Sequence, residues 1–480
     1  MTSLRQRRTT LAGSITGAVI VALDGTVLTV AQPTLQRTLH ASFAQVQWTS
    51  TGYLIAVAGL LVFAGRLGDR YGHQRLFALG ILGFGAASAG IGLAPGIGWV
   101  IGLRVVQGVF GALLQPATLG MLRAAYPPDQ LGMPIALRTS AIGLSAAAGP
   151  IVGGALVAQL SWRAVFFLNV APALLAGLLA LAVRLPKPPA PAPAPSLPGR
   201  HAVPPTAPPS GLDLPGAFLL CLTLGTLVHT LVTLPESGWT PVTASGALLV
   251  AAGCAAFVRH ERRTASPLVP PGVLGSRPVG AGLAVLVSAS AAMFGALFVG
   301  TYFLQDVLEL DPFQCGLRVL PLAAMMVLAA PASAVVQRRY GPRRTTTTAM
   351  ALLAAGILTL SQLDRTATPL AIGTGFFLLG AGFGAVMVTA TSVIVRHASV
   401  DHAGVAGGLQ QTAMNVGPTL GVALATMLLT LTSTMGVALL ALSVLAVAGA
   451  LVALALPSSH SANPAPPAAG YPQEAASRNA

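Results

Sequence analysis

Charged side chains are scarce in this chain of 480 residues. Only 8% of the residues are Asp, Glu, Lys or Arg, whereas 54% are hydrophobic. A soluble domain carries about 25% charged residues, which form its hydrated surface. Most of the surface of this chain must therefore face lipid, and the composition predicts an integral membrane protein.

Lysine and cysteine are also rare, and their scarcity excludes several classes of protein. Lys187 is the only lysine and lies in a Pro-rich stretch, so the chain has no G-x-x-x-x-G-K-[ST] loop and is not an ATP-driven pump. Its three cysteines lack metal-ligand spacing and are too few for a disulfide framework. No apolar segment carries a cluster of His, Cys or carboxylate groups, so we expect no enzyme activity, no metal and no cofactor.

Long apolar segments dominate the rest of the chain. A helix needs about 20 apolar residues to cross a bilayer. Fourteen segments are close to this length, and the weakest of them, 242–259, is short. They lie near 11–33, 46–66, 75–95, 98–121, 134–158, 163–185, 213–234, 242–259, 279–303, 316–336, 345–362, 368–393, 404–430 and 435–456.

The arginines support this count of fourteen spans. The net charge of +14 comes from basic residues in short loops, which indicates membrane topology and not a nucleic-acid partner. If both termini are cytoplasmic, nearly all basic residues fall on the cytoplasmic side, as the positive-inside rule requires. The exceptions are Arg37, Arg163, Arg318 and Arg365 on the outer side and Arg104 within a span.

The chain repeats itself at offsets of 268 to 273 residues. Residues 70–75 match 339–344 as R-Y-G-x-x-R, residues 149–153 match 417–421 as G-P-x-x-G, and residues 110–112 match 383–385 as F-G-A. These offsets correspond to a shift of eight spans, so two six-helix halves must flank an inserted pair of helices. Two parallel six-helix repeats around a central site define the major facilitator fold.

This organisation predicts an all-α membrane protein of five segments. They are an N-terminal six-helix bundle (1–185), a Pro-rich cytoplasmic linker (186–210), two inserted helices (211–260), a C-terminal six-helix bundle (261–457) and a disordered cytoplasmic tail (458–480).

Four motifs lie at defined places in these spans. Residues 65–72 read G-R-L-G-D-R-Y-G in the loop after the second span, and residues 104–111 read R-V-V-Q-G-V-F-G in the fourth. Residues 143–154 read G-L-S-A-A-A-G-P-I-V-G-G in the fifth span, where Pro150 removes a backbone donor and small residues permit close helix packing. Residues 23–33 read L-D-G-T-V-L-T-V-A-Q-P in the first.

These motifs resemble those of the fourteen-helix drug:proton antiporter family of the major facilitator superfamily. The resemblance implies a multi-pass protein of the bacterial cytoplasmic membrane, both termini inside, that exports hydrophobic drugs or antibiotics by proton antiport. It implies a conformational latch at the first motif, formed by Gly65, Asp69, Arg70, Gly72 and Arg75. It implies an antiporter motif in the fifth span, formed by Gly143, Gly149, Pro150, Gly153 and Gly154. Here His73 and Gln74 stand where the family usually has a basic pair, so the latch is expected to be weaker or sensitive to pH.

Asp24 is the one acidic residue deep in a predicted span. Burial disfavours a carboxylate ion, which suits a group that takes up and releases a proton. Asp24 lies about 20 Å from the inner end of the first span and Arg104 about 11 Å from the outer end of the fourth. The two residues are therefore at similar depth, and we expect them to pair and to couple proton movement to transport.

Polar residues on other spans are candidates for substrate contacts. They are Tyr53, Gln107, Gln115, Asn169, Gln410, Gln411 and Asn415. The expected partners are the lipid bilayer, protons and a hydrophobic small molecule, and the expected state is a monomer. Two alternatives stay open: a facilitator or proton symporter for a small metabolite, and a non-transporting membrane sensor with the same fold.

Overall fold

The computed structural model describes residues 4–182, 212–310, 312–399, 402–432 and 434–458, and this part of the chain is helical without strands. The predicted linker (186–210) and nearly all of the predicted tail (458–480) lie outside the described residues. The N-terminal helices are α1 (Leu4–Thr38), α2 (Phe43–Tyr71), α3 (His73–Gly92), α4 (Ile97–Ala125), α5 (Gly132–Gln159), α6 (Trp162–Phe167), α7 (Val170–Ala182), α8 (Leu214–Ser237) and α9 (Pro241–Glu261). They are followed by α10 (Pro271–Leu274), α11 (Arg277–Tyr302), α12 (Pro312–Ser361), α13 (Pro369–His397), α14 (Ala403–Thr432) and α15 (Met435–Ala453).

The helix boundaries agree with the predicted spans with three informative differences. Thirteen described helices are long and apolar enough to cross a membrane, because α12 runs through two predicted spans and is counted once. The predicted span 163–185 is broken into α6 and α7 by a turn at 168–169. The predicted span 242–259 is longer than expected, because Thr240 caps α9 with its side chain and begins the helix at Pro241.

The repeated R-Y-G sequence forms the same turn in both halves. Gly72 separates α2 from α3 with a φ of 96°, and Gly341 interrupts α12 with a φ of 82°. Only glycine adopts such a backbone at no steric cost, so both glycines are needed to reverse the chain between two packed helices. The break at Gly341 divides α12 into the two spans that the sequence predicted.

The repeated G-P-x-x-G sequence also has the same role in both halves, which is to permit close helix packing. A Cβ atom at Gly153 would lie 2.9 Å from the Val27 side chain, so α5 packs tightly on α1. A Cβ atom at Gly417 would lie 2.6 Å from that of Ser290, and one at Gly421 would overlap the carbonyl group of Ala291, so α14 packs equally tightly on α11. The internal repeat is thus a repeat of helix packing, in which glycine lets two backbones approach closely.

Replacing Gly421 by alanine should destabilise the C-terminal half, because the new methyl group would meet backbone and not a movable side chain. Overpacking of this kind costs about 1–3 kcal/mol. A thermal unfolding series in detergent would measure the loss. Gly316→Ala is the matched control, since a Cβ atom there meets nothing within 4 Å. Equal melting temperatures for the two variants would contradict this account of the motif.

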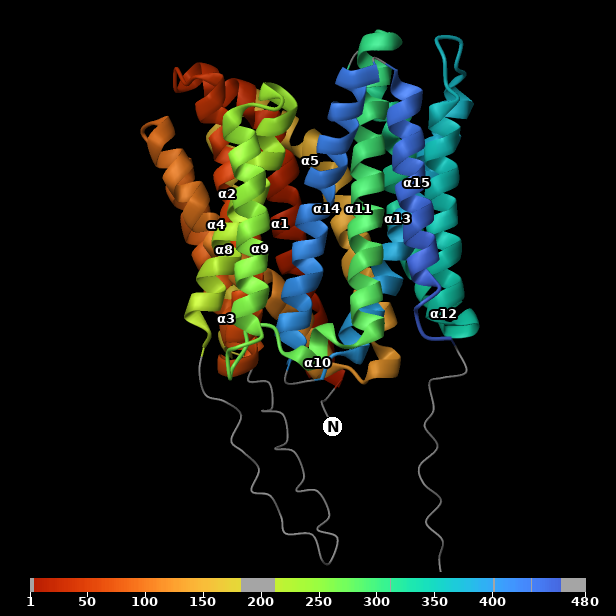
Figure 1. The fold of residues 1–480 in the computed structure, drawn as a ribbon. Coiled ribbons are helices and arrows are strands. Elements are labelled where there is room, and N and C mark those ends of the chain that lie inside the picture. Colours follow the sequence, from red (N-terminus) through yellow and green to blue (C-terminus); the bar gives the residue numbers. More distant parts are fainter. Residues whose placement is uncertain (1–3, 183–211, 311, 400–401, 433, 459–480) are drawn as a thin grey trace, which may run out of the picture.

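The helices form two groups that stand side by side (Figure 1). One contains α1 to α7 and the other contains α11 to α15, and α8 and α9 lie beside the first. α8 packs on α2 and α14, whereas α9 packs mainly on α8 and is the least buried of the candidate spans. The inserted pair therefore lies where α2 of one half meets α14 of the other.

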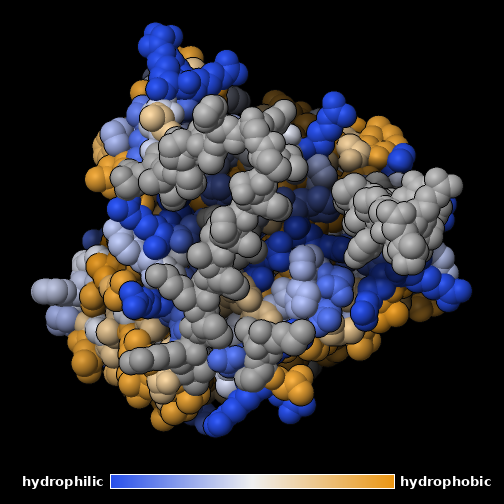
Figure 2. Space-filling view, turned by 90° about the horizontal axis from the view of Figure 1, so that it is seen from below, coloured by the Kyte–Doolittle hydropathy of each residue, from blue (hydrophilic) through white to orange (hydrophobic). Residues whose placement is uncertain are grey.

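The two groups approach each other most closely at the end that carries the start of α1, the α2–α3 turn and α10, which we call the N-terminal face (Figure 1). Seen from this side, hydrophilic side chains gather over the surface and hydrophobic ones lie mostly toward its edge (Figure 2). Leu122 and Ile135 of one half pack there against Ala334 and Val395 of the other. The Ser140 hydroxyl also donates a hydrogen bond to the Val327 carbonyl across the same contact.

Candidate proton-coupling site and latch

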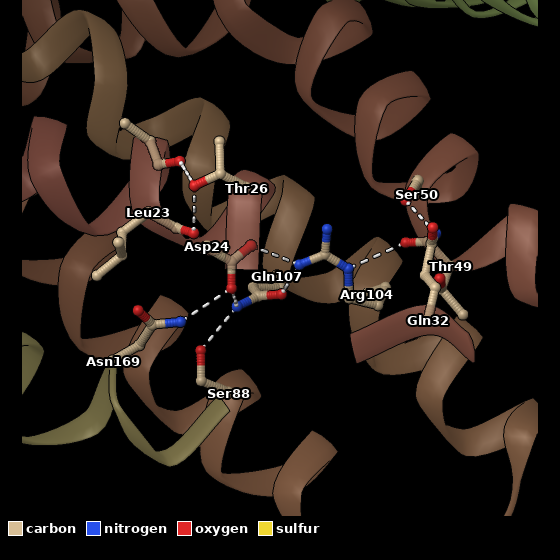
Figure 3. A network of polar contacts seen from close by, with 11 residues as sticks. Leu23, Asp24, Thr26, Gln32, Thr49, Ser50, Ser88, Arg104, Gln107 and Asn169 are labelled. Carbon is tan, nitrogen blue, oxygen red and sulfur yellow. Dashed lines mark hydrogen bonds and ion pairs between the residues drawn. The ribbon is translucent and has the colours of Figure 1, made fainter. Parts of the chain in front are cut away.

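Asp24 and Arg104 form a buried ion pair at the centre of the N-terminal half (Figure 3). Arg104 Nη1 lies 2.6 Å from Asp24 Oδ2, and the two residues are 1% and 3% exposed. The pairing predicted from their similar depth is therefore observed. Arg104 does not extend toward the outer surface, because α4 aims its side chain at α1.

Three further side chains complete the surroundings of the carboxylate (Figure 3). Gln107 Nε2 donates to Asp24 Oδ1 at 3.1 Å and to Ser88 Oγ at 2.7 Å, and Asn169 Nδ2 donates to Asp24 Oδ1 at 2.9 Å. Asn169 lies at the break between α6 and α7, which places its amide inside the bundle. Asp24 thus accepts hydrogen bonds from one guanidinium and two amides, and the one from Arg104 is charge-assisted.

The guanidinium of Arg104 keeps other partners besides Asp24. Its Nε donates to the Thr49 carbonyl at 3.0 Å, and its Nη1 also donates to Gln107 Oε1 at 2.5 Å. Its charge lies 4.3 Å from the centre of the Tyr53 ring, a cation–π contact. Protonation of Asp24 would remove the opposite charge while these contacts to α2 and α4 remain. Arg104 is thus also held to α2 and α4 by contacts that do not involve Asp24.

The predicted latch joins the two halves at the N-terminal face. Asp69, in the last turn of α2, accepts hydrogen bonds from the amides of Gly404 at 2.7 Å and Val405 at 3.0 Å, at the start of α14. A carboxylate at a helix N-terminus satisfies free amides and interacts favourably with the helix dipole. Gly65 lies against the backbone of Gly404, so the helices meet without intervening side chains.

His73 belongs to the latch in place of the usual basic residue. Its Nε2 lies 3.2 Å from Asp69 Oδ1, and its ring packs on Gly68, Gly120 and Gly404. Gly72 forms the turn, and Arg70 lies over the Tyr71 ring. Arg75 is exposed in the first turn of α3. The predicted latch residues therefore lie at one corner of the N-terminal face, and Asp69 makes the contact between the halves.

The equivalent contact in the other half lacks this cap. The repeat places Arg338 at the position of Asp69, and α5 begins at the position of α14. No side chain caps the start of α5 within the described residues. A cavity of about 380 Å³ lies there instead, lined by residues that include Asp129, Gly132, Ala334 and Arg338. The two related contacts between the halves are thus built differently.

The candidate substrate residues fall into three groups. Tyr53, Gln107 and Asn169 contact the Asp24–Arg104 pair, as described above. Gln115 of α4 accepts a hydrogen bond from Gln411 of α14 across the two halves. The remaining two stay within the C-terminal half, where Gln410 donates to Thr391 Oγ1 at 3.2 Å and Asn415 donates to the Gln411 carbonyl at 2.8 Å.

The glycines of the predicted antiporter motif have different neighbours. Gly149 and Gly153 face Thr26 and Val27 of α1, whereas Gly143 faces Met326 of α12 in the other half. A Cβ atom at Gly154 would meet nothing within 4 Å. The backbone of Pro150 is helical, and its side chain lies outside the described part. The motif therefore packs α5 against both α1 and the opposite half.

Sequence reasoning missed several partners in these networks. Ser88 was detectable as a polar residue in the apolar α3. The Thr49 carbonyl and the amides of Gly404 and Val405 gave no signal, because every residue carries these groups. Only the placement of the helices in space shows which backbone groups receive a charged side chain.

Comparison with known proteins shows to which family this architecture belongs. The sequence profile of the Major Facilitator Superfamily matches residues 15–421. The tetracenomycin C resistance and export protein of Streptomyces glaucescens is 40% identical over 415 residues, which cover 86% of this chain and 74% of that protein. The puromycin resistance protein of Streptomyces alboniger is 35% identical, covering 85% and 78%. The multidrug efflux pump LfrA of Mycolicibacterium smegmatis is 30% identical, covering 84% and 77%.

A solved structure supports the fold independently. The human organic anion transporter MFSD10 superposes with a TM-score of 0.64 at 14% identity, over 93% of this chain and 99% of that one. This likeness shows the fold, whereas the family profile and the relatives define a multi-pass membrane transporter and not an enzyme. The chain belongs to the major facilitator superfamily.

Proposed function

We propose that this transporter exports hydrophobic drugs or antibiotics in exchange for protons, with Asp24 as the coupling carboxylate. The observation that carries the proposal is the buried contact of Asp24 with Arg104 and Gln107 of α4 and with Asn169 at the break between α6 and α7. A titratable group with such partners changes the packing of several helices when it binds a proton. The names of the relatives support the substrate class.

The latch supports alternating access. We assign the N-terminal face to the cytoplasm, since the arginine-rich loops lie there. The contacts through Asp69, Gln411 and Ser140 then close the cytoplasmic side, and the structure corresponds to the outward-facing state. Breaking the Asp69 contact would open the cytoplasmic side and give the inward-facing state. We further propose that the protein lies in the bacterial cytoplasmic membrane with both termini inside, which is consistent with the bacterial relatives.

We also propose how the chain is divided. Residues 1–185 and 261–457 form the two moving bundles, and residues 211–260 form an inserted pair attached to the first. The contacts of α8 with α2 and of α14 with α2 support this division, because they place the pair beside the contact between the bundles. Export as a monomer needs no further subunit in this scheme.

Proton exchange is directly measurable. Inverted vesicles that contain the protein should release luminal protons when a transported dye such as ethidium is added, and a protonophore should abolish dye uptake. In an antiporter, each dye molecule that enters the vesicle lumen must be exchanged for protons that leave it. Dye uptake without proton movement would identify a facilitator, and neither signal, across many dyes and antibiotics, would favour the sensor alternative.

A further inference from the structure

Three arginines at the end of α9 surround a hollow in the surface. Arg259, Arg262 and Arg263 line a depression of about 550 Å³ together with Cys254, Ala255 and Val258. The arginines are exposed, and none makes an ion pair with a residue that the structure describes. The hollow therefore combines an unbalanced positive rim with an apolar wall.

The position of the hollow limits what can occupy it. α9 is the least buried span, so Cys254 and Val258 face the lipid and the arginines lie at the level of the headgroups. Guanidinium groups bind phosphate through paired hydrogen bonds. Basic clusters immediately beyond a membrane helix attract anionic lipids of the cytoplasmic leaflet. A phospholipid matches both parts of the hollow, with its phosphate on the arginines and its acyl chain on the apolar wall.

The same end of α9 is connected to the latch. Glu261, which lies between the arginines in sequence, accepts hydrogen bonds from the amides of Leu268 and Val269, both at 3.0 Å. Leu268 and Val269 pack in one apolar cluster with Val62 of α2, Ala217 of α8 and Val405 of α14. Val405 is one of the two residues whose amides Asp69 binds. A short chain of contacts thus runs from the arginines to the start of α14.

A hydrogen bond between His260 and Asp213 also joins the inserted helices at this point. His260 Nε2 lies 2.8 Å from Asp213 Oδ1, and Asp213 Oδ1 also caps α8 through the amide of Gly216 at 2.9 Å. The start of α8 is therefore tied to the end of α9. Because α8 packs on both α2 and α14, a ligand that fixes α9 also restricts the contact between the halves.

We propose that the arginines of α9 form a binding site for an anionic phospholipid of the cytoplasmic leaflet, and that the bound lipid stabilises the closed latch. The inserted pair then transmits lipid binding to the contact between the halves. The proposal rests on the proposed orientation of the protein, but not on proton coupling or on the identity of the exported compound.

The experiment compares nanodiscs of phosphatidylcholine with and without phosphatidylglycerol. Lipid retention is measured by native mass spectrometry, and the latch by hydrogen exchange of the backbone amides at residues 404 and 405. Each arginine near a membrane surface strengthens anionic-lipid binding about fivefold, so R259Q/R262Q/R263Q should bind phosphatidylglycerol roughly a hundredfold more weakly. Phosphatidylglycerol should slow exchange at 404–405 in the wild type and have no effect in this variant.

Two control variants separate the site from the general charge of the face. R5Q/R8Q/R343Q removes three exposed arginines of the same face and should leave both measurements near those of the wild type. Glu261→Ala should retain the lipid and lose its effect on exchange, since it breaks the connection to Leu268 and Val269.

Three results would overturn the proposal. One is equal lipid retention by the α9 triple variant and the wild type. Another is unchanged exchange at 404–405 when the wild type binds phosphatidylglycerol. The third is binding of inorganic phosphate that is as strong as binding of phosphatidylglycerol, because the hollow would then be a site for soluble anions. None of these measurements depends on transport, so a failure of the proposed export function would leave them interpretable.

Discussion

Replacing Asp24 by asparagine should reduce proton-driven efflux to the level of cells that lack the transporter. Asparagine retains the shape of the side chain and its contacts with Gln107 and Asn169, but it cannot exchange a proton. It also leaves Arg104 without a counter-charge, and breaking a buried ion pair in this way costs about 3–5 kcal/mol. Ethidium efflux from energised cells, with a protonophore control, measures the effect.

Protein levels decide how this experiment is interpreted. Asp24→Asn combined with Arg104→Gln removes both charges and should recover expression without recovering coupled transport. Asp364→Asn is the matched control, because that carboxylate is exposed in the connection between α12 and α13 and bonds only locally, to Thr366. Full protonophore-sensitive efflux by the Asp24 variant would show that the coupling group lies elsewhere.

Replacing Gly65 by valine should drive the protein out of the closed state. Any Cβ atom at this position would overlap the carbonyl group of Gly404, so the two halves must separate to accept it. The expected cost of such overpacking is about 1–3 kcal/mol, which changes the population of the closed state up to a hundredfold. Transport should fall by a similar factor, because the cycle reaches one of its two end states more rarely.

Distances across the N-terminal face would measure this shift. Tyr71 and Tyr340 are equivalent residues of the two R-Y-G turns, and both are about half exposed, so cysteines there can carry spin labels. The native Cys221, Cys254 and Cys315 must first be replaced. Gly65→Val should lengthen the distance between the labels, whereas Gly154→Ala, where a Cβ atom meets nothing within 4 Å, should not. An unchanged distribution in the Gly65 variant would refute the role of this close approach.

The fold was accessible from the sequence because apolar length and arginine placement are one-dimensional signals. The repeat then fixed which helices correspond, and the glycines at 72 and 341 have the same backbone conformation in both halves. The break between α6 and α7 was not accessible, since the residues around Asn169 are as apolar as an unbroken span. The continuation of α1 to Leu4 was also missed, because its first two turns are polar and extend beyond the expected hydrocarbon core.

The candidate site was only partly accessible. The depths of Asp24 and Arg104 in their two helices were enough to predict that the side chains meet, because charged groups within a membrane usually pair with one another. It could not show that Gln107 and Asn169 hold the carboxylate, since an amide gives no sign of its partner. Asp69 was predicted as part of a latch, and only the structure identifies the start of α14 as the group that it binds.

The different residues at positions 69 and 338 have a consequence for the speed of the cycle. A carboxylate that caps a helix contributes about 0.5–2 kcal/mol, which corresponds to a lifetime of the closed state only a few-fold to thirtyfold longer. A transporter must leave this state at every turnover, so a brief dwell is an advantage. An acidic residue at position 338 would add a second cap. The two caps together would lengthen the lifetime of the closed state by the product of their separate factors. With Arg338 at that position, only the Asp69 cap at the start of α14 delays the opening of the closed state. The related contact at the start of α5 adds no such delay.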